Sequence, residues 1–201
     1  MVKVYIEGGG ESNSLRTDLR KAFQNFFISA GLNKKPRVVA SGSRNEAFDD
    51  FCCAVRTLSD NDVALLLVDS EETFTKDDNS VEYLKKRDSW NFPNDVDSCL
   101  VHLMVVTMET WLIADPKSLQ ESFGAGFNSE VFSKVKDIET VSKEDAYSLL
   151  DKAFKDTPSK KYIKGKHSFR ALACVDASKV CAVCKHANLF INKLKELESY
   201  M

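Results

Sequence analysis

Four acidic residues each follow an apolar stretch of the chain. Glu7 ends the segment VYIE, Asp69 and Glu71 end LLLVDSE, and Glu109 follows LVHLMVVTM. Such apolar runs are typical of strands buried in a parallel sheet. Because sites in open α/β sheets form at the carboxyl ends of the strands, we expect these side chains to lie near one another.

Carboxylates gathered in one place repel one another, and burial disfavours their charged form unless a cation neutralises them. Oxygen ligands select hard ions such as Mg²⁺ or Mn²⁺, which keep open positions for phosphate oxygens. The pattern therefore predicts a site for Mg²⁺ or Mn²⁺ that acts on phosphodiester or phosphoryl groups. An acidic residue after a strand can also cap a helix or face solvent, and the sequence leaves that alternative open.

The segment KKYIKGKHSFR is the basic cluster of the chain, with Tyr162 and Phe169 among its cations. A carboxylate site needs cations nearby to hold a polyanion and to stabilise a charged transition state. We expect Lys164 to take part in catalysis, and Lys166 and His167 to bind substrate. The alternative is a solvated loop.

Two further segments at the same sheet edge suit a phosphate. Arg44 follows the second strand in the motif SGSR, whose backbone amides could bind a phosphate. Gly8 and the two glycines after it leave room for substrate or metal beside Glu7, and no Gly-Lys-Ser/Thr follows, which disfavours a P-loop ATPase or kinase. Arg44 and Gly8 are therefore predicted substrate contacts.

The elements that must position these residues alternate between strands and helices. Apolar runs predict strands at 2–6, 37–40, 63–68 and 100–106. Apolar residues at helical spacing predict helices at 15–27 and 47–58, and a short helix at 81–87. We expect an α/β fold, with a mainly parallel sheet of about four strands flanked by helices.

The rest of the chain is predicted to be helical. A helix begins in METWLIAD and is limited by Pro116, and further helices are predicted at 143–155, 168–174 and 177–198. We expect an α/β core over residues 1–118 and a helical C-terminal extension over residues 119–201, packed on the core as one globular unit.

Composition limits the class of protein. The 201 residues are 43% hydrophobic and 29% charged, which is typical of a globular chain, and the net charge of −2 means that any nucleic-acid binding must be local. The sequence shows no signal peptide and no apolar run near the roughly 18 residues of a membrane span, so we expect a cytoplasmic protein. The Cys-x-x-Cys spacing of Cys181 and Cys184 can bind zinc, but the helical periodicity around it favours core thiols.

A strand that ends in Glu7-Gly8, followed by helix-connected strands and a hydrophobic strand that ends in Asp69-Ser70-Glu71, resembles the Toprim fold of topoisomerases, primases and related nucleases. Glu71 departs from the second Asp of that pattern. The blocks IEGGGE, PRVVASGSRNEAFDDF, LLLVDSE, HLMVVTMETWLIAD and YIKGKHS resemble the prokaryotic family called domain of unknown function forty-two seventy-six. METWLIAD is also similar to a block of the Toprim-related RloB-like proteins, which tend to be encoded beside AAA-type ATPases in defence loci.

The resemblance implies roles for individual residues. Glu7 would be a general base or a metal-contacting acid, Asp69 and Glu71 would hold the metal, and Glu109 would complete the acidic site with Trp111 packed beneath it. The expected function is a Mg²⁺- or Mn²⁺-dependent nuclease, with nucleic acid as substrate and an AAA-type ATPase as a candidate partner. A non-catalytic Toprim-like binding module and a small-molecule phosphoesterase are the alternatives.

Overall fold

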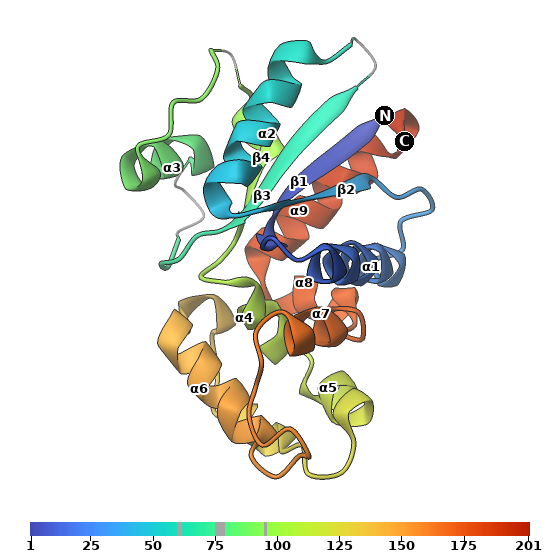
Figure 1. Ribbon diagram of the computed structural model, residues 1–201, viewed down its shortest axis with the longest axis vertical. Helices are drawn as coiled ribbons and strands as arrows, with labels where there is room; N and C mark the ends of the chain where they lie inside the picture. The colour runs from blue at the N-terminus through green and yellow to red at the C-terminus, as the bar shows by residue number, and fades with distance from the viewer. Residues whose placement is uncertain (60–61, 75–78, 95) are drawn as a thin grey trace.

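The fold is an α/β sandwich built on one parallel sheet. The computed structural model describes residues 1–59, 62–74, 79–94 and 96–201 (Figure 1). Its four strands are all parallel and lie in the order β2-β1-β3-β4. The strands are β1 (Val2–Gly9), β2 (Arg37–Gly42), β3 (Val63–Asp69) and β4 (Val101–Met104). The predicted fold class is confirmed.

Helices cover both faces of the sheet because successive side chains of its central strands point to opposite sides. Val4 and Ile6 belong to one buried cluster with α1 (Asn13–Ser29) and α9 (Lys185–Glu196). Tyr5 and Leu66 belong to the other, with α2 (Arg44–Thr57) and α3 (Ser80–Asp88). Figure 1 shows α2 in front of the sheet and α9 behind it.

Helices α1 and α2 begin directly beyond the strand ends, and their caps fix where they start. Ser12 accepts a hydrogen bond from the amide of Leu15 at the start of α1. At α2, the Ser43 hydroxyl accepts from the Glu46 amide, and the Glu46 carboxylate accepts from the Ser43 amide at 2.7 Å. This capping box makes Arg44 the first residue of α2, at the carboxyl edge of the sheet.

Most of the remaining helices pack against that edge or beside it. Its helices are α4 (Met108–Ile113), α5 (Pro116–Phe123), α6 (Lys143–Phe154), α7 (Lys166–Leu172) and α8 (Ala177–Val183), with short 3-10 turns η1 (Ser98–Leu100), η2 (Ser129–Phe132), η3 (Ile138–Thr140) and η4 (Leu197–Tyr200). In Figure 1, α4 to α7 lie below the sheet. No helix in the described ranges is both long and apolar enough to cross a membrane.

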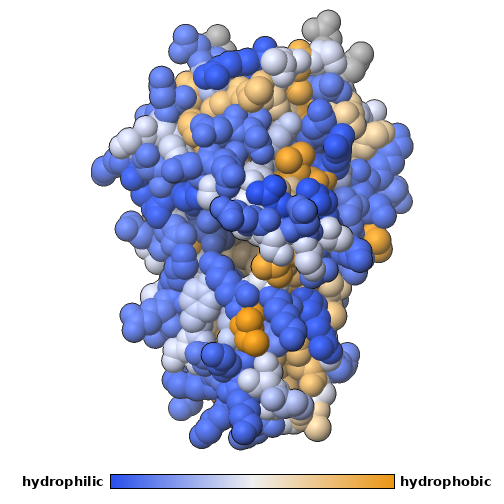
Figure 2. Space-filling view, viewed as in Figure 1, coloured by the Kyte–Doolittle hydropathy of each residue, from blue (hydrophilic) through white to orange (hydrophobic). Residues whose placement is uncertain are grey.

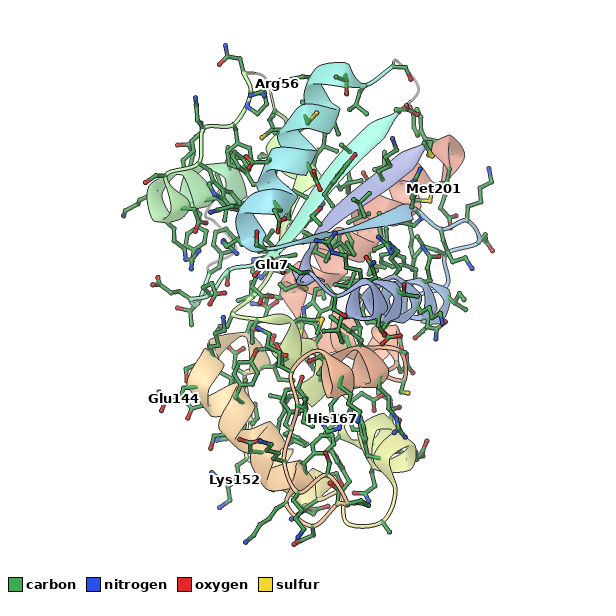
Figure 3. All side chains as sticks on the ribbon, viewed as in Figure 1. Glu7, Arg56, Glu144, Lys152, His167 and Met201 are labelled. Carbon is green, nitrogen blue, oxygen red and sulfur yellow. The ribbon has the colours of Figure 1, made fainter. Side chains whose placement is uncertain are left out.

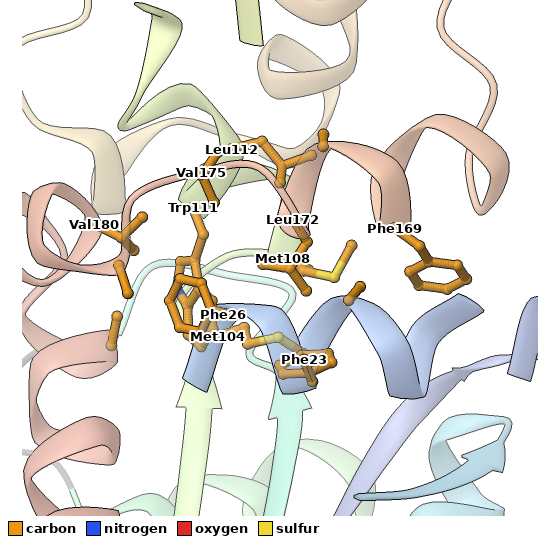
Figure 4. Close-up of a cluster of buried hydrophobic side chains, with 14 of the residues drawn as sticks. Phe23, Phe26, Met104, Met108, Trp111, Leu112, Phe169, Leu172, Val175 and Val180 are labelled. Atoms are coloured by element: carbon orange, nitrogen blue, oxygen red, sulfur yellow. The ribbon is translucent and has the colours of Figure 1, made fainter. Parts of the chain in front are cut away.

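One apolar cluster joins the sheet to these helices. Trp111 of α4 is fully buried, and its ring stacks on Phe26 of α1 with centroids 5.3 Å apart (Figure 4). It also lies 6.5 Å from the ring of Phe190 of α9. Burial of each of these large side chains stabilises the fold by about 1.5–3 kcal/mol. The α/β part and the helical part of the chain therefore share a core.

Several elements differ from the sequence prediction. The helix expected at 177–198 is broken, because Cys184 is extended and Glu139 accepts a 2.9 Å hydrogen bond from the amide of His186 at the start of α9. The fourth strand ends at Met104 rather than at residue 106. Pro116 also begins a helix, α5, which the sequence analysis did not predict; Asp115 caps it through the amide of Ser118.

Candidate metal centre

Three predicted site residues converge where β1 and β3 end. Glu7 lies in β1, Asp69 ends the neighbouring strand β3, and Glu71 follows two residues later. One carboxylate oxygen from each lies within 4.8 Å of the others. Figure 3 labels Glu7 at the lower end of the sheet, where the helical part of the chain begins. The expected proximity of these three carboxylates is confirmed.

An irregular end of β1 sets the position of Glu7. Glu7, Gly8 and Gly9 all face the single residue Gly42 of β2, so the regular alternation of faces stops there. Gly8 has φ = 136°, and a Cβ atom at this position would approach Leu19 to 2.6 Å. A side chain at position 8 would therefore displace the glycine loop from the acidic residue that precedes it.

Glu71 lies in a turn after β3 that is hydrogen-bonded to the segment following β4. Its backbone has φ = 69°, which is unusual for a residue other than glycine, and its amide donates to the carbonyl of Val106 at 2.8 Å. The carboxylate pairs with Lys143 of α6 at 2.5 Å. The turn and the lysine together orient the Glu71 side chain toward the other two carboxylates.

Asp69 is buried at the centre of the group. Its carboxylate accepts hydrogen bonds from the Met108 amide at 2.9 Å and the Thr107 hydroxyl at 3.1 Å. Burial, followed by the neighbouring carboxylates of Glu7 and Glu109, raises the pKa of Asp69 to about 8. Asp69 therefore holds a proton at neutral pH unless a cation replaces it.

Glu109 lies deeper, with 1% of its surface exposed, and is linked to Asp69 through Thr107. The Thr107 hydroxyl lies 2.8 Å from Glu109 and 3.1 Å from Asp69. Because a hydroxyl carries one proton, Thr107 can donate to only one of these carboxylates at a time; when Asp69 is protonated, Asp69 donates to the Thr107 oxygen and Thr107 donates to Glu109. This agrees with the raised pKa of Asp69.

Two hydroxyl groups that the sequence analysis did not assign to the site fix Glu109 from the other side. Tyr162 and Ser168 donate to the same carboxylate oxygen at 3.0 and 3.1 Å, and their own oxygens lie 2.5 Å apart. The Ser168 oxygen also accepts from the Gly165 amide. Burial and the Glu109 charge raise the pKa of Tyr162. Tyr162 lies within the basic segment KKYIKGKHSFR, and this position was the feature of the sequence that could have indicated a role at the site.

Lys164 brings a positive charge to the same region. Its Nζ atom lies 5.6 Å from the centre of the Tyr147 ring. Burial alone lowers the pKa of Lys164, but the Tyr147 side chain and the carboxylates of Glu109 and Asp69 outweigh that effect and raise it. The ammonium group is therefore charged beside the acids.

A cavity of about 490 Å³ opens beside these groups. Glu7, Asp69, Glu109 and Lys164 line it, together with the glycine loop that begins at Gly8 and several apolar side chains. Figure 2 shows a hollow near the middle of a largely hydrophilic face, close to where Figure 3 labels Glu7.

Arg44 lies behind the carboxylates rather than along the cavity. Its Nη1 atom lies 3.3 Å from Glu7 and also donates to the backbone carbonyl of Asp69. Its other side is bound by both oxygens of Asp88, at 3.2 and 2.8 Å. The amide of Ser43 is already bound to Glu46, so this amide is not free to donate to a phosphate.

The other two predicted substrate contacts do not line the cavity. Lys166 is exposed at the start of α7. His167 is buried in the lower half of the molecule (Figure 3), stacked on Phe154 with centroids 4.6 Å apart, and its Nδ1 accepts from the Ile163 amide. The structure brings His167 into an apolar interior because α7 turns that face away from the sheet edge.

The six cysteines are free thiols. Cys184 is buried, and burial raises the pKa of its thiol. Among the residues that the structure describes, the three carboxylates are the group of His, Cys, Asp or Glu side chains that could hold a metal.

Comparisons with known proteins give one match. Neither the curated proteins nor the solved structures include a match to this chain. The family model described as Domain of unknown function (DUF4276) matches residues 6–195, a range that holds all four predicted acidic residues. The chain therefore belongs to the DUF4276 family.

Proposed function

We propose that this protein is a Mg²⁺- or Mn²⁺-dependent nuclease of the Toprim type that hydrolyses phosphodiester bonds of DNA or RNA. The observation that supports it is the convergence of Glu7, Asp69 and Glu71 at the carboxyl edge of the sheet. Oxygen atoms bound to one Mg²⁺ at about 2.1 Å lie roughly 3–4 Å apart, so small side-chain rotations would let these carboxylates share an ion.

The donor set fits such an ion. Glu7 is paired with Arg44 and Glu71 with Lys143, whereas Asp69 has only neutral hydrogen-bond donors and no ion pair within the described part of the chain. Asp69 is thus the carboxylate that most lacks a cation. Burial and the neighbouring carboxylates raise the pKa of Asp69, and a divalent cation in place of the proton would stabilise its charged form against both effects.

Each residue of the site then has a task. When bound, the cation supplies Lewis-acid polarisation of the phosphate. Glu7, at the rim of the cavity, is the candidate general base for an attacking water. Lys164 would stabilise the charge that develops on the phosphate, and Glu109 would keep Thr107 and Asp69 in place.

A cleavage assay tests the proposal. Plasmid, single-stranded DNA and tRNA are each incubated with Mg²⁺, Mn²⁺ or EDTA, and with wild type, Asp69→Asn or the control Asp18→Asn, a change of the same kind at an exposed position of α1. We expect cleavage of at least one substrate with metal, none with EDTA, and none with Asp69→Asn. Cleavage in EDTA, or at full rate by Asp69→Asn, would contradict the proposal.

Two other functions are separated by the same assay. Binding without cleavage would assign a non-catalytic nucleic-acid module, which the pairing of Glu71 with Lys143 favours because it occupies one carboxylate. Hydrolysis of small phosphoesters alone would assign a phosphoesterase, which the size of the cavity favours. The similarity of METWLIAD to RloB-like proteins further supports a phage-defence effector that acts with an AAA-type ATPase, and cleavage in the presence of such a partner would test it.

A further inference from the structure

The cavity beside the carboxylates has an apolar part that phosphate chemistry alone does not require. Leu15, Met104, Met108 and Phe169 line it along with the acids. Figure 4 shows Met108 and Phe169 on the side of α1 that faces α7. A cavity of about 490 Å³ with apolar walls and a few charged groups matches the sites that bind ligands of small-molecule size. A flat, solvated phosphate-binding surface would lack these walls.

The charges of the site disfavour binding through a long phosphate backbone. Duplex binders neutralise many phosphates with lysine and arginine. Here Arg44 is bound by Glu7 and Asp88, and Lys143 by Glu71. Of the described residues that line the cavity, Lys164 is the cation, while four are acidic: Glu7, Glu11, Asp69 and Glu109. Much of the affinity for a nucleic acid must therefore come from burying an apolar group in the cavity.

Burial of the acids adds a geometric requirement. Asp69 is 6% exposed and forms part of the cavity wall. A phosphate that reaches it must bring its own sugar and base with it, and a base can enter such a pocket only when it is outside a duplex stack.

We propose that this cavity receives one unpaired nucleotide of a single-stranded nucleic acid, with the phosphate toward Glu7 and Asp69 and the base against Leu15, Met108 and Phe169. The inference rests on the proposed function, because the carboxylate site provides the reason for a phosphate to lie there. Stacking on an aromatic ring and burial of the base are tolerant of sequence, so weak sequence preference is expected.

Binding is measured separately from cleavage. The fluorescence anisotropy of a labelled single strand is compared with that of a hairpin duplex of the same composition, with Ca²⁺ in place of Mg²⁺, and a nucleoside monophosphate is used as competitor. Leu15→Trp fills the cavity from a half-buried position in the first turn of α1. Ile28→Trp is the matched control, at a 55% exposed position near the other end of the same helix. Thermal unfolding of both variants checks that they fold.

We expect the single strand to bind at least about tenfold more tightly than the duplex, with that affinity lost in Leu15→Trp and kept in Ile28→Trp. Equal binding of the duplex, or unchanged binding by folded Leu15→Trp, would overturn the inference. A mononucleotide that binds as tightly as the strand would also overturn it, since the cavity would then serve free nucleotides. Strand binding of the expected kind with no cleavage under any metal would instead contradict the nuclease and leave this inference standing.

Discussion

Arg44 holds the carboxylate of Glu7 across 3.3 Å, from the helix that follows the neighbouring strand. The opposite side of the same guanidinium is bound by both oxygens of Asp88. The Cζ atom of Arg44 lies 5.0 Å from the centre of the Trp90 ring. The position of a predicted catalytic acid thus depends on a planar, forked cation that is fixed on several sides.

We expect that a lysine at position 44 cannot take over the role of this arginine. In Arg44→Lys the charge remains but the fork is lost, so we expect weaker Mg²⁺ binding and a lower cleavage rate. Arg44→Ala should also lower the free energy of unfolding by about 3 kcal/mol, because it leaves Asp88 and Glu7 without this partner. Calorimetric metal titration and urea unfolding measure both effects. Arg56→Lys, in the last turn of the same helix, is the control and should change neither.

The raised pKa of Asp69 makes the stability of the metal-free protein depend on pH. The carboxyl group has a pKa near 3.8 in the unfolded chain and about 8 in the folded protein. Between these values the folded protein binds one more proton, so the free energy of unfolding falls as pH rises, by roughly 1.4 kcal/mol per pH unit from this group. Its stabilising contribution is present below the lower pKa and is lost as pH rises through the upper one.

Urea unfolding at several pH values between about 5 and 8 tests this dependence. Asp69→Asn should remove this part of the slope and be more stable than wild type near pH 8, and Mg²⁺ should flatten the wild-type slope because the cation takes the place of the proton. Asp18→Asn should keep the wild-type slope. An equal slope in wild type and Asp69→Asn would show that the carboxyl group titrates normally in the folded protein.

Two lysines of the basic segment should differ in their contribution to nucleic-acid binding. Lys164 lines the cavity, whereas Lys166 is exposed outside it. Lys164→Ala should weaken binding and lower the slope of log affinity against log salt concentration by about one, since one phosphate contact is lost. Lys166→Ala should change both quantities less. Equal effects of the two substitutions in anisotropy titrations would place the bound strand along the outer surface of α7 instead.

The sequence was informative where a local pattern and its surroundings agree. Central strands of a parallel sheet are continuous apolar runs, so Glu7 and Asp69 stand out as the polar residues that end them. Parallel strands then bring such ends together, which is why the convergence of Glu7, Asp69 and Glu71 could be predicted.

The remaining parts of the site depend on contacts between distant segments. Tyr162 and Ser168 meet Glu109 across more than 50 residues, and an isolated hydroxyl carries no pattern that names its partner. The break between α8 and α9 likewise depends on Glu139, which contacts His186 from 47 residues away. His167 looked like part of a basic surface because helical periodicity over a seven-residue helix does not indicate which face is buried.

The core around Trp111 has a consequence for how the protein unfolds. Trp111, Phe26 and Phe190 join the sheet side and the C-terminal helices in one cluster. Loss of α9 would therefore uncover part of one face of the sheet, and a fragment of residues 1–118 should not fold. The whole chain should lose its structure in a single cooperative transition. The two tryptophans report on this separately: Trp90 lies in the cluster on the opposite face, so Trp90→Phe and Trp111→Phe each leave one probe. The denaturation midpoints from the two probes are compared after correction for the stability change of each substitution. Coincident midpoints would mean that the sheet unfolds together with the helices that support the carboxylates.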